Sequence, residues 1–295
     1  MKTTIPEALT ADVPQTIWGK ILSATPVVMT VVATMLAGLS SSEMTRAQYD
    51  RAYAAQLQAK AGDQWNYFQA KKLRGAIQRS SAELLRATAD LAPLETRLRN
   101  ANPDFQQSIV AMDQMLAAAA DAPAVDPNVK AALDAVSGDK PDPEILALLK
   151  AVKEPSLAKA LEIAKNRARE FDANLRAADP DFDSKVAALA AKDKALAQAL
   201  TALRMEYQSR RYETEAKLNQ AIANIYELQV RKNNMSAERH HARSQRFFFG
   251  MLAAQAAVII ATFALAAKKR NLLWSLAATA GVAAILFALY VYLYV

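Results

Sequence analysis

Three long apolar stretches at the two ends of the chain restrict what it can fold into. They run from Ile21 to Leu39, from Phe247 to Ala267 and from Leu272 to Val295, and none contains a charged residue. A hydrocarbon core about 30 Å thick needs roughly 20 apolar residues of helix to cross it. We therefore predict transmembrane helices over residues 17–40, 247–267 and 272–295, which anchor both ends of a middle segment in a membrane.

The composition of that middle segment favours helices over sheets. It is rich in Ala, Leu, Lys, Glu, Gln and Arg, which are strong helix formers, and the whole chain of 295 residues has only seven Gly. The chain also has no Cys, which excludes disulfides, thiolate nucleophiles and Cys-ligated metal centres. We predict an all-α membrane protein.

Two proline-free arms adjoin the membrane segments. We predict an ascending stalk helix over residues 41–92 and a descending stalk helix over residues 181–246. In the descending arm, apolar residues step by four, three and four positions from Leu196 to Tyr207, which is a coiled-coil spacing. Because both arms lead into the membrane, we expect them to pair as a long antiparallel, coiled-coil-like stalk.

Prolines cluster between the arms, over residues 93–180, where we predict a small helical head. Asp or Asn before Pro marks a helix start, since the first residue caps the helix and the second suits its first position. This pattern predicts helix starts at Pro103, Pro127, Pro143 and Pro180.

One sequence echo occurs in this head. Residues 98–105 resemble residues 175–182, and each copy is predicted to end one helix and begin the next, with a Phe available to pack at the corner. Convergence on a good helix–turn–helix sequence explains the echo equally well. If the two corners meet, they bring together acidic side chains, for which helix capping is the alternative role. These side chains are Asp104, Asp179, Asp181 and Asp183.

The remaining segments are an N-terminal tail, residues 1–16, and a basic hairpin loop, residues 268–271. Short basic loops between membrane helices stay in the cytoplasm. This rule predicts a multi-pass protein of the bacterial inner membrane with residues 40–246 in the periplasm. Basic residues beside the second membrane segment argue for the opposite orientation. The first apolar stretch is longer than a signal-peptide core, so we interpret it as an uncleaved anchor.

Charge is distributed unevenly along the chain. Residues 43–79 and 204–246 each carry a net charge of +4, whereas residues 83–194 carry a net charge of −4. Basic arms beside a membrane suit anionic lipid headgroups, although such residues also serve as the solvated faces of long helices. The excess is too small, and lacks the motifs, for a nucleic-acid partner. The candidate lipid contacts are Arg239, Arg243, Arg246, Lys268, Lys269 and Arg270.

An aromatic box in the ascending arm is the most distinctive motif. Its candidate packing or interaction residues are Trp65, Tyr67, Phe68, Gln69 and Lys71. We interpret the box as a packing layer against the opposite arm, with stacking on a ligand or partner as the alternative. Adjacent histidines on a helix point about 100° apart, so His240 and His241 make a poor metal site.

The box is also where the chain resembles a known family. Gln64-Trp65, the aromatic pair and Gln69-Ala70-Lys71 resemble the signature of domain-of-unknown-function family 4337, a group of bacterial membrane proteins. The layout agrees as well, with one N-terminal membrane helix, an Ala-rich helical middle and two C-terminal membrane helices split by a short basic loop. The resemblance implies no activity or cofactor.

No residue pattern predicts a catalytic, cofactor-binding or metal site. We therefore expect no enzyme and no cofactor, but a scaffolding homo-oligomer that self-associates through its spans and stalk. The alternatives are an accessory or adaptor subunit of an envelope or transport complex, whose head contacts a protein partner, and a channel formed between subunits. Small residues recur every four positions within the spans, and they join helices either within one subunit or between subunits.

Overall fold

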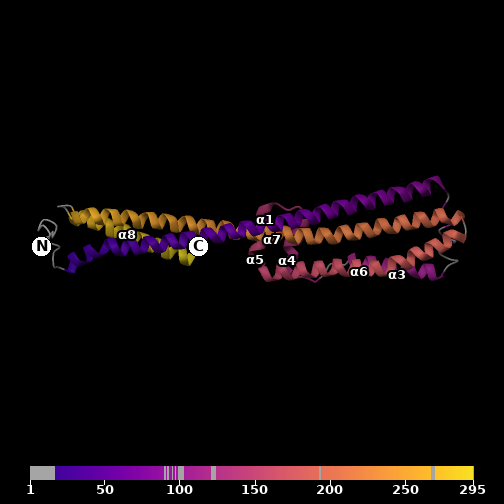
Figure 1. Cartoon of the computed structure of the whole chain (residues 1–295), viewed down its shortest axis with the longest axis horizontal. Helices are drawn as coiled ribbons and strands as arrows, with labels where there is room; N and C mark the ends of the chain where they lie inside the picture. The colour runs from indigo at the N-terminus through magenta and orange to yellow at the C-terminus, as the bar shows by residue number, and fades with distance from the viewer. Residues whose placement is uncertain are drawn as a thin grey trace, which may run out of the picture. The chain divides into compact units, whose positions relative to one another are not determined.

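The computed structural model is mostly helical in the part of the chain that it describes. It describes residues 17–89, 91, 93–94, 96, 98, 103–120, 124–192, 194–266 and 270–294. Every regular element among these residues is a helix, as Figure 1 shows, which confirms the predicted all-α class. The elements are α1 (Ile17–Thr88), α3 (Pro103–Ala120), α4 (Pro127–Ser137), α5 (Asp142–Ala151), α6 (Glu154–Lys192), α7 (Lys194–Ala266) and α8 (Arg270–Tyr294).

Three of these helices, α1, α7 and α8, are long and apolar enough to cross a membrane. This finding agrees with the three predicted spans and indicates a membrane protein. α1 has 72 residues and α7 has 73, so each continues far beyond the roughly 20 residues that a bilayer requires. Pro26 lies inside α1 without ending it.

The chain divides into two compact units. The first, which we call the span unit, comprises Met1–Tyr53 and Asn233–Val295, and the second, the middle unit, comprises Ala54–Lys232. Both α1 and α7 contribute residues to both units. The predicted tail, residues 1–16, and most of the basic hairpin, with Lys268 and Lys269, lie outside the described residues.

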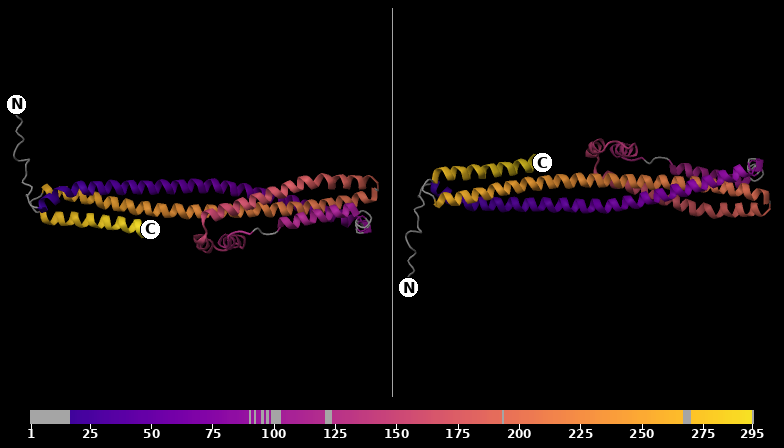
Figure 2. Two further views of the ribbon diagram at one scale, coloured as in Figure 1. Left: turned by 90° about the horizontal axis from the view of Figure 1, so that it is seen from below. Right: turned by 90° about the horizontal axis from the view of Figure 1, so that it is seen from above.

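The span unit packs α8 beside the N-terminal part of α1 and the C-terminal part of α7, as the views in Figures 1 and 2 agree. Its apolar core takes residues from all three helices. A Cβ added to Gly281 of α8 would lie 2.5 Å from the sulfur of Met29 in α1, so these helices approach closely there. The core residues are Ala33, Leu36, Phe247, Ala254, Ala284 and Val291.

The small residues of the spans are buried inside one chain. Of the predicted stripe in α7, Ala257 and Ala261 have no solvent-exposed area and Ala253 is partly buried, while Ala277 of α8 has no exposed area either. Small side chains let helices in a membrane approach closely and gain van der Waals contact. Of the two roles that the sequence left open for these stripes, the structure favours contact between helices of one subunit.

The middle unit builds its core where α3 and α6 pack against α7. One apolar cluster contains Phe105 and Met112 of α3, Phe182 of α6, and Leu200 and Leu203 of α7. The short helices α4 and α5 pack against each other, and α4 also contacts α6.

The predicted helix starts have mixed outcomes. α3 and α4 begin at Pro103 and Pro127 as predicted, and the Asp126 side chain accepts a hydrogen bond from the backbone N–H of Asn128. α5 begins one residue before the predicted start, at Asp142, with Pro141 as its N-cap.

The predicted start at Pro180 is wrong, because α6 continues through this proline to Lys192. An interior proline costs a helix about 3 kcal/mol through its missing N–H and its ring. Tertiary contacts offset that cost here, since Asp179 pairs with Arg211 and Phe182 stacks on Phe105. Residues 181–192 therefore belong to α6 and not to the descending helix, which begins at Lys194.

Residues spaced by seven, small except for Phe68 and Val230, line the facing sides of α1 and α7 in a pattern that we call the inner seam. Two sets of hydrogen bonds show which positions meet. In the span unit, the Ser40 and Ser244 hydroxyls each donate to the other residue's carbonyl, and in the middle unit the Ser209 hydroxyl donates to the Gly75 carbonyl. On α1 the seam comprises Ala47, Ala54, Ala61, Phe68, Gly75 and Ala82, and on α7 it comprises Ala202, Ser209, Ala216, Ala223, Val230 and Ala237.

Candidate functional site

The structure divides the aromatic box between two sides of α1. Trp65 donates from its indole N–H to Glu227 of α7 over 2.6 Å, and its ring meets that of Phe68 edge to face. The ammonium group of Lys71 lies over the Tyr212 ring of α7. Tyr67 and Gln69 are exposed instead. The box therefore contributes Trp65 and Lys71 to the contact with α7, packs Phe68 on Trp65, and leaves Tyr67 and Gln69 at the surface.

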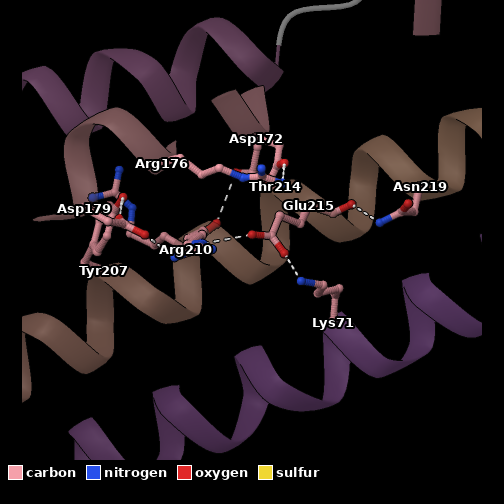
Figure 3. A network of polar contacts seen from close by, with 10 residues as sticks. Lys71, Asp172, Arg176, Asp179, Tyr207, Arg210, Thr214, Glu215 and Asn219 are labelled. Carbon is pink, nitrogen blue, oxygen red and sulfur yellow. Dashed lines mark hydrogen bonds and ion pairs between the residues drawn. The ribbon is translucent and has the colours of Figure 1, made fainter. Parts of the chain in front are cut away.

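Lys71 also belongs to a polar network that joins three helices, shown in Figure 3. Its ammonium group forms an ion pair with Glu215 of α7, toward which the figure shows it reaching. The Arg211 guanidinium donates to Glu215 over 2.8 Å and also pairs with Asp179 of α6. Tyr207 donates to the same Asp179 carboxylate. One arginine of α7 thus holds carboxylates from two helices.

Burial and charge shift two pKa values in this network. Burial of the phenol raises the pKa of Tyr207 well above its usual range, and the neighbouring negative charge of Asp179 adds to the shift. Burial disfavours the charged form of Arg211, but its hydrogen bond to Glu215 and the charges of Asp179 and Glu215 outweigh this effect. The pKa of Arg211 is therefore raised, and its side chain stays charged.

The two echoed corners of the sequence meet in the middle unit. Phe105 of α3 and Phe182 of α6 stack with their ring centroids 5.7 Å apart, and Phe182 also contacts the Tyr207 ring of α7. The equivalent Phe residues of the two copies thus pack on each other. Although α6 does not turn at its copy, the packing role predicted for these rings holds.

Three of the four aspartates near these corners are paired with cations. Asp179 pairs with Arg211, as described above. Asp181 pairs with Lys185 within α6, and Asp183 pairs with Arg204 of α7. Asp179 and Asp183 therefore connect α6 to α7, and together with Asp181 they are paired with cations rather than gathered in an unpaired acidic cluster. Asp104 lies in the first turn of α3, where negative charge suits the helix dipole.

Two shallow grooves border α3. The first, of about 270 Å³, runs over Met112, Leu203 and Tyr207, and its rim carries the ion pair between Asp113 and Arg210. The second, of about 390 Å³, lies between α3 and α6 beside Phe171. Each groove is lined by both apolar and charged side chains.

A buried carboxylate lies in the span unit, four residues beyond the first apolar stretch. Glu43 of α1 is only 7% exposed. His240 contacts its carboxylate from α7 through Nδ1 over 2.5 Å, and Arg243 approaches it to 3.6 Å. The adjacent His241 instead contacts Gln245. The two histidines thus diverge, and each has a different partner.

The predicted lipid contacts occupy different environments. Arg239 is exposed, whereas Arg243 is largely buried beside Glu43 and Arg246 is partly buried. Lys268 and Lys269 lie outside the described residues, as does the side chain of Arg270. Their contacts with lipid remain a prediction, and the structure adds a carboxylate partner for Arg243.

The chemistry of these clusters is that of charge pairing between helices. Among the described residues, no group of three or more His, Cys, Asp or Glu side chains is arranged to hold a metal ion. The carboxylates around Arg211 each face a cation or a hydrogen-bond donor. Such an arrangement fixes the relative positions of helices, because removing one partner leaves an uncompensated charge.

Sequence reasoning missed Arg211 and Glu43, the centres of the two charge clusters. The partners that join them to another helix, Asp179 for Arg211 and His240 for Glu43, lie far away in sequence, so no local spacing identifies them. The inner seam did leave a signal, since Ala47, Ala54 and Ala61 are exactly one heptad apart. The predicted coiled-coil spacing rests on large apolar residues of the descending arm, whereas the residues that meet α1 are mostly small.

Comparison with known protein families yields a match. A family described as "Domain of unknown function (DUF4337)" matches residues 18–127, which confirms the resemblance derived from the aromatic box. The matched region holds the first predicted span, the part of α1 that carries the box, and α3. Searches of the curated proteins and of the solved structures found no match to this chain.

Proposed function

We propose that this chain, a member of the DUF4337 family, is a membrane-anchored scaffolding protein that associates with copies of itself and has no catalytic activity. In this proposal α1 and α7 form an antiparallel coiled stalk, and α3 to α6 form a helical head. The stalk is supported by the order of contacts in the middle unit. The α7 partners descend from Glu227 to Glu206 as the α1 residues ascend from Trp65 to Arg86.

The observation that carries the proposal is the apolar outer surface of α1 in the middle unit. Three large side chains on this surface are more than half exposed: Leu73 at 62%, Ile77 at 55% and Leu84 at 65%. Helices that face water normally place such side chains in a core. A row of exposed apolar residues outside the membrane segments indicates a surface that contacts another protein.

The clusters described above support a structural role over a catalytic one. The charged side chains around Arg211 are paired with one another across α1, α6 and α7. Catalytic groups need access to a substrate, whereas these groups contact each other and hold the helices together. We therefore propose no enzymatic activity for this protein.

We place the protein in the bacterial inner membrane, with residues 40–246 in the periplasm. The short basic loop between α7 and α8 supports this orientation through the positive-inside rule. A Cys introduced at the exposed Lys150 tests it, because the chain has no other Cys. A membrane-impermeant maleimide should label this variant in intact cells with a permeable outer membrane. Labelling only after lysis would place the middle unit in the cytoplasm.

Native mass spectrometry of the full chain in lipid nanodiscs tests self-association. We expect masses at whole multiples of 32.1 kDa, the mass of one chain. The dimer should be the main species. Two controls are empty nanodiscs and nanodiscs that contain a single-span control protein. The second shows how often two chains enter one nanodisc by chance. If the chain is only monomeric, under conditions in which the control protein keeps its known oligomeric state, the proposed scaffolding function is wrong.

An adaptor that binds a different protein is the second candidate. The two grooves beside α3 favour it, because their mixed apolar and charged linings suit an amphipathic partner helix. Met112→Glu would place a charge on the floor of the first groove, and Asp113→Ser would change only its rim. If the protein is an adaptor, Met112→Glu should abolish recovery of a stoichiometric partner from native membranes, while Asp113→Ser should retain it.

A further inference from the structure

The exposed surface of α1 has its own seven-residue repeat, which we call the outer seam. Its positions are separated by four and three residues in strict alternation over about three heptads. All of them are exposed within the chain. The outer seam comprises Asn66, Ala70, Leu73, Ile77, Ser80, Leu84 and Ala87.

The outer seam lies nearly opposite the inner seam on the same helix. In a coiled coil of 3.5 residues per turn, each residue advances the helix by about 103°, so Gly75 points about 150° away from Ile77. The inner side of α1 is occupied by α7, as the Gly75–Ser209 contact shows. α1 can therefore keep its partner within the chain while its other side contacts a second helix.

A second copy of this chain fits the outer seam because of the membrane. All copies insert in the same sense, so two associated copies are related by an axis along the membrane normal. Under that symmetry α1 of one copy runs parallel to α1 of the other, and each outer-seam residue meets its own equivalent. The seam residues are then aligned in register without any further adjustment.

The residue types of the outer seam suit a parallel pair. With Ala70, Ile77 and Leu84 at the first core position of the heptad, Leu73 and Ser80 occupy the second. A β-branched residue at the first position with Leu at the second favours two strands over three or four. Leu73 at the second position of one heptad and Ile77 at the first position of the next provide these two residue types and form the centre of the seam.

The flanking positions place no like charges opposite each other. In a parallel pair, each flanking residue faces the residue five positions later on the partner helix. Arg74 therefore faces Gln69 of the other copy, and Glu83 faces Thr88. Lys72 and Arg79 point away from the seam. The charges that make this arm basic thus do not oppose the pairing.

We propose that the outer seam of α1 is a parallel, two-stranded interface between two copies of this chain, with Leu73 and Ile77 at its centre. The inference rests on the proposed self-association and adds its surface and its orientation. With three large apolar residues, the seam alone is too short for a stable pair in solution. Anchoring in one bilayer raises the effective concentration of the second copy and makes such a contact sufficient.

Disulfide crosslinking in native membranes tests the interface. The chain has no Cys, so a single substitution reports one position. Ser80→Cys places a thiol within the seam, and Ser81→Cys makes the same change one residue away, outside it. Under a mild oxidant we expect Ser80→Cys to form a crosslinked dimer of the chain at least tenfold faster than Ser81→Cys. Equal rates, no dimer, or a crosslink to a different protein would overturn the interface.

A pair of charge insertions separates this interface from self-association in general. Ile77→Asp adds a charge within the seam, and Ala76→Asp adds it beside the seam at an exposed position. In nanodiscs we expect Ile77→Asp to lose the dimer mass and Ala76→Asp to keep it. If both variants stay dimeric, the outer seam is wrong although self-association stands. If the unsubstituted chain is monomeric, both the seam and the proposed function are wrong.

Discussion

The span unit and the middle unit hold the same two long helices together with different side chains. In the span unit, α7 contributes alanines without exposed area, such as Ala257 and Ala261, to contacts with its neighbours. In the middle unit, ion pairs such as Lys71–Glu215 and Arg86–Glu206 add to the small residues of the inner seam. Lipid offers no hydrophobic drive between helices, so close packing replaces it there, whereas water permits charges at the edges.

The outer surfaces of the two units teach more than the inner ones. Exposed apolar side chains in the span unit, such as Ile259 and Phe263, suit a lipid environment. Exposed apolar side chains in the middle unit, such as Leu73 and Leu84, have no lipid to contact under our proposal. An exposed apolar surface thus needs no protein partner in the span unit, where lipid covers it, but requires one in the middle unit.

The strongest way to break this comparison is to remove the arginine at the centre of the middle unit. Arg211→Met leaves Asp179 and Glu215 without their shared cation, and all three side chains are largely buried. We expect a loss of about 3 kcal/mol in the free energy of opening of the middle unit. Hydrogen exchange of α6 and α7 amides measures it, and the amides of α8 should be unaffected.

Arg176→Met is the matched control. This arginine is 79% exposed and pairs only with Asp172 one turn earlier, so its loss should cost less than about 0.5 kcal/mol. Similar exchange for the two variants would mean that the network around Arg211 does not hold the helices.

Overpacking the span unit tests the other side of the comparison. Ala257→Leu adds three carbons at a residue of α7 that has no exposed area. Ala256→Leu adds the same carbons at an exposed residue. We expect the first variant to lose about 2 kcal/mol and the second to remain near the unsubstituted chain. Thermal unfolding in mild detergent compares them. A harmless Ala257→Leu would show that the alanines are not in close contact.

Salt should distinguish the two units without any substitution. Raising the salt concentration to about 1 M shortens the Debye length to about 3 Å and screens the partly exposed ion pairs of the middle unit. We expect its slow-exchanging amides to lose a few tenths of a kcal/mol of protection per exposed pair, while α8 changes little. Equal changes in both units would contradict the division of roles.

The smallest effect concerns Tyr207 at high pH. Because the pKa of this phenol is raised in the folded chain, its contribution to stability is complete below pH 10 and is lost as the pH rises further. The unfolded chain, with an ordinary phenol, releases its proton first. With Tyr207→Phe, the middle unit should therefore lose less stability as the pH rises above 10. Unfolding monitored by circular dichroism at several pH values measures this loss. An unchanged slope would indicate an ordinary phenol at this position.

The sequence alone predicts the helices of this protein better than their ends and contacts. The apolar segments and the proline-free arms predicted α1, α7 and α8, because length and hydrophobicity are properties of one segment. Pro180 was read as a helix start, but its local signal was outweighed by contacts of Asp179 and Phe182 with other helices. A single sequence contains the local preference and not the distant partner that overrides it.

The residues of the candidate site could likewise be predicted from the sequence only in part. The aromatic box was visible because its rings are adjacent in sequence, yet which of them face α7 was not. Trp65 turned out to face Glu227, and Tyr67 to be exposed. Arg211 and Glu43 gave no signal, because a charged residue on a long helix looks the same whether it is solvated or paired.

The central claim is that α1 binds α7 with one side and a second copy of the chain with the other. Spin labels attached at Ser80→Cys in nanodiscs, measured by double electron–electron resonance, test it most directly. The account predicts one narrow distance between the labels of two copies, which disappears when labelled chains are diluted with unlabelled ones. An absence of dipolar coupling, or a broad distribution that changes with the lipid-to-protein ratio, would contradict it.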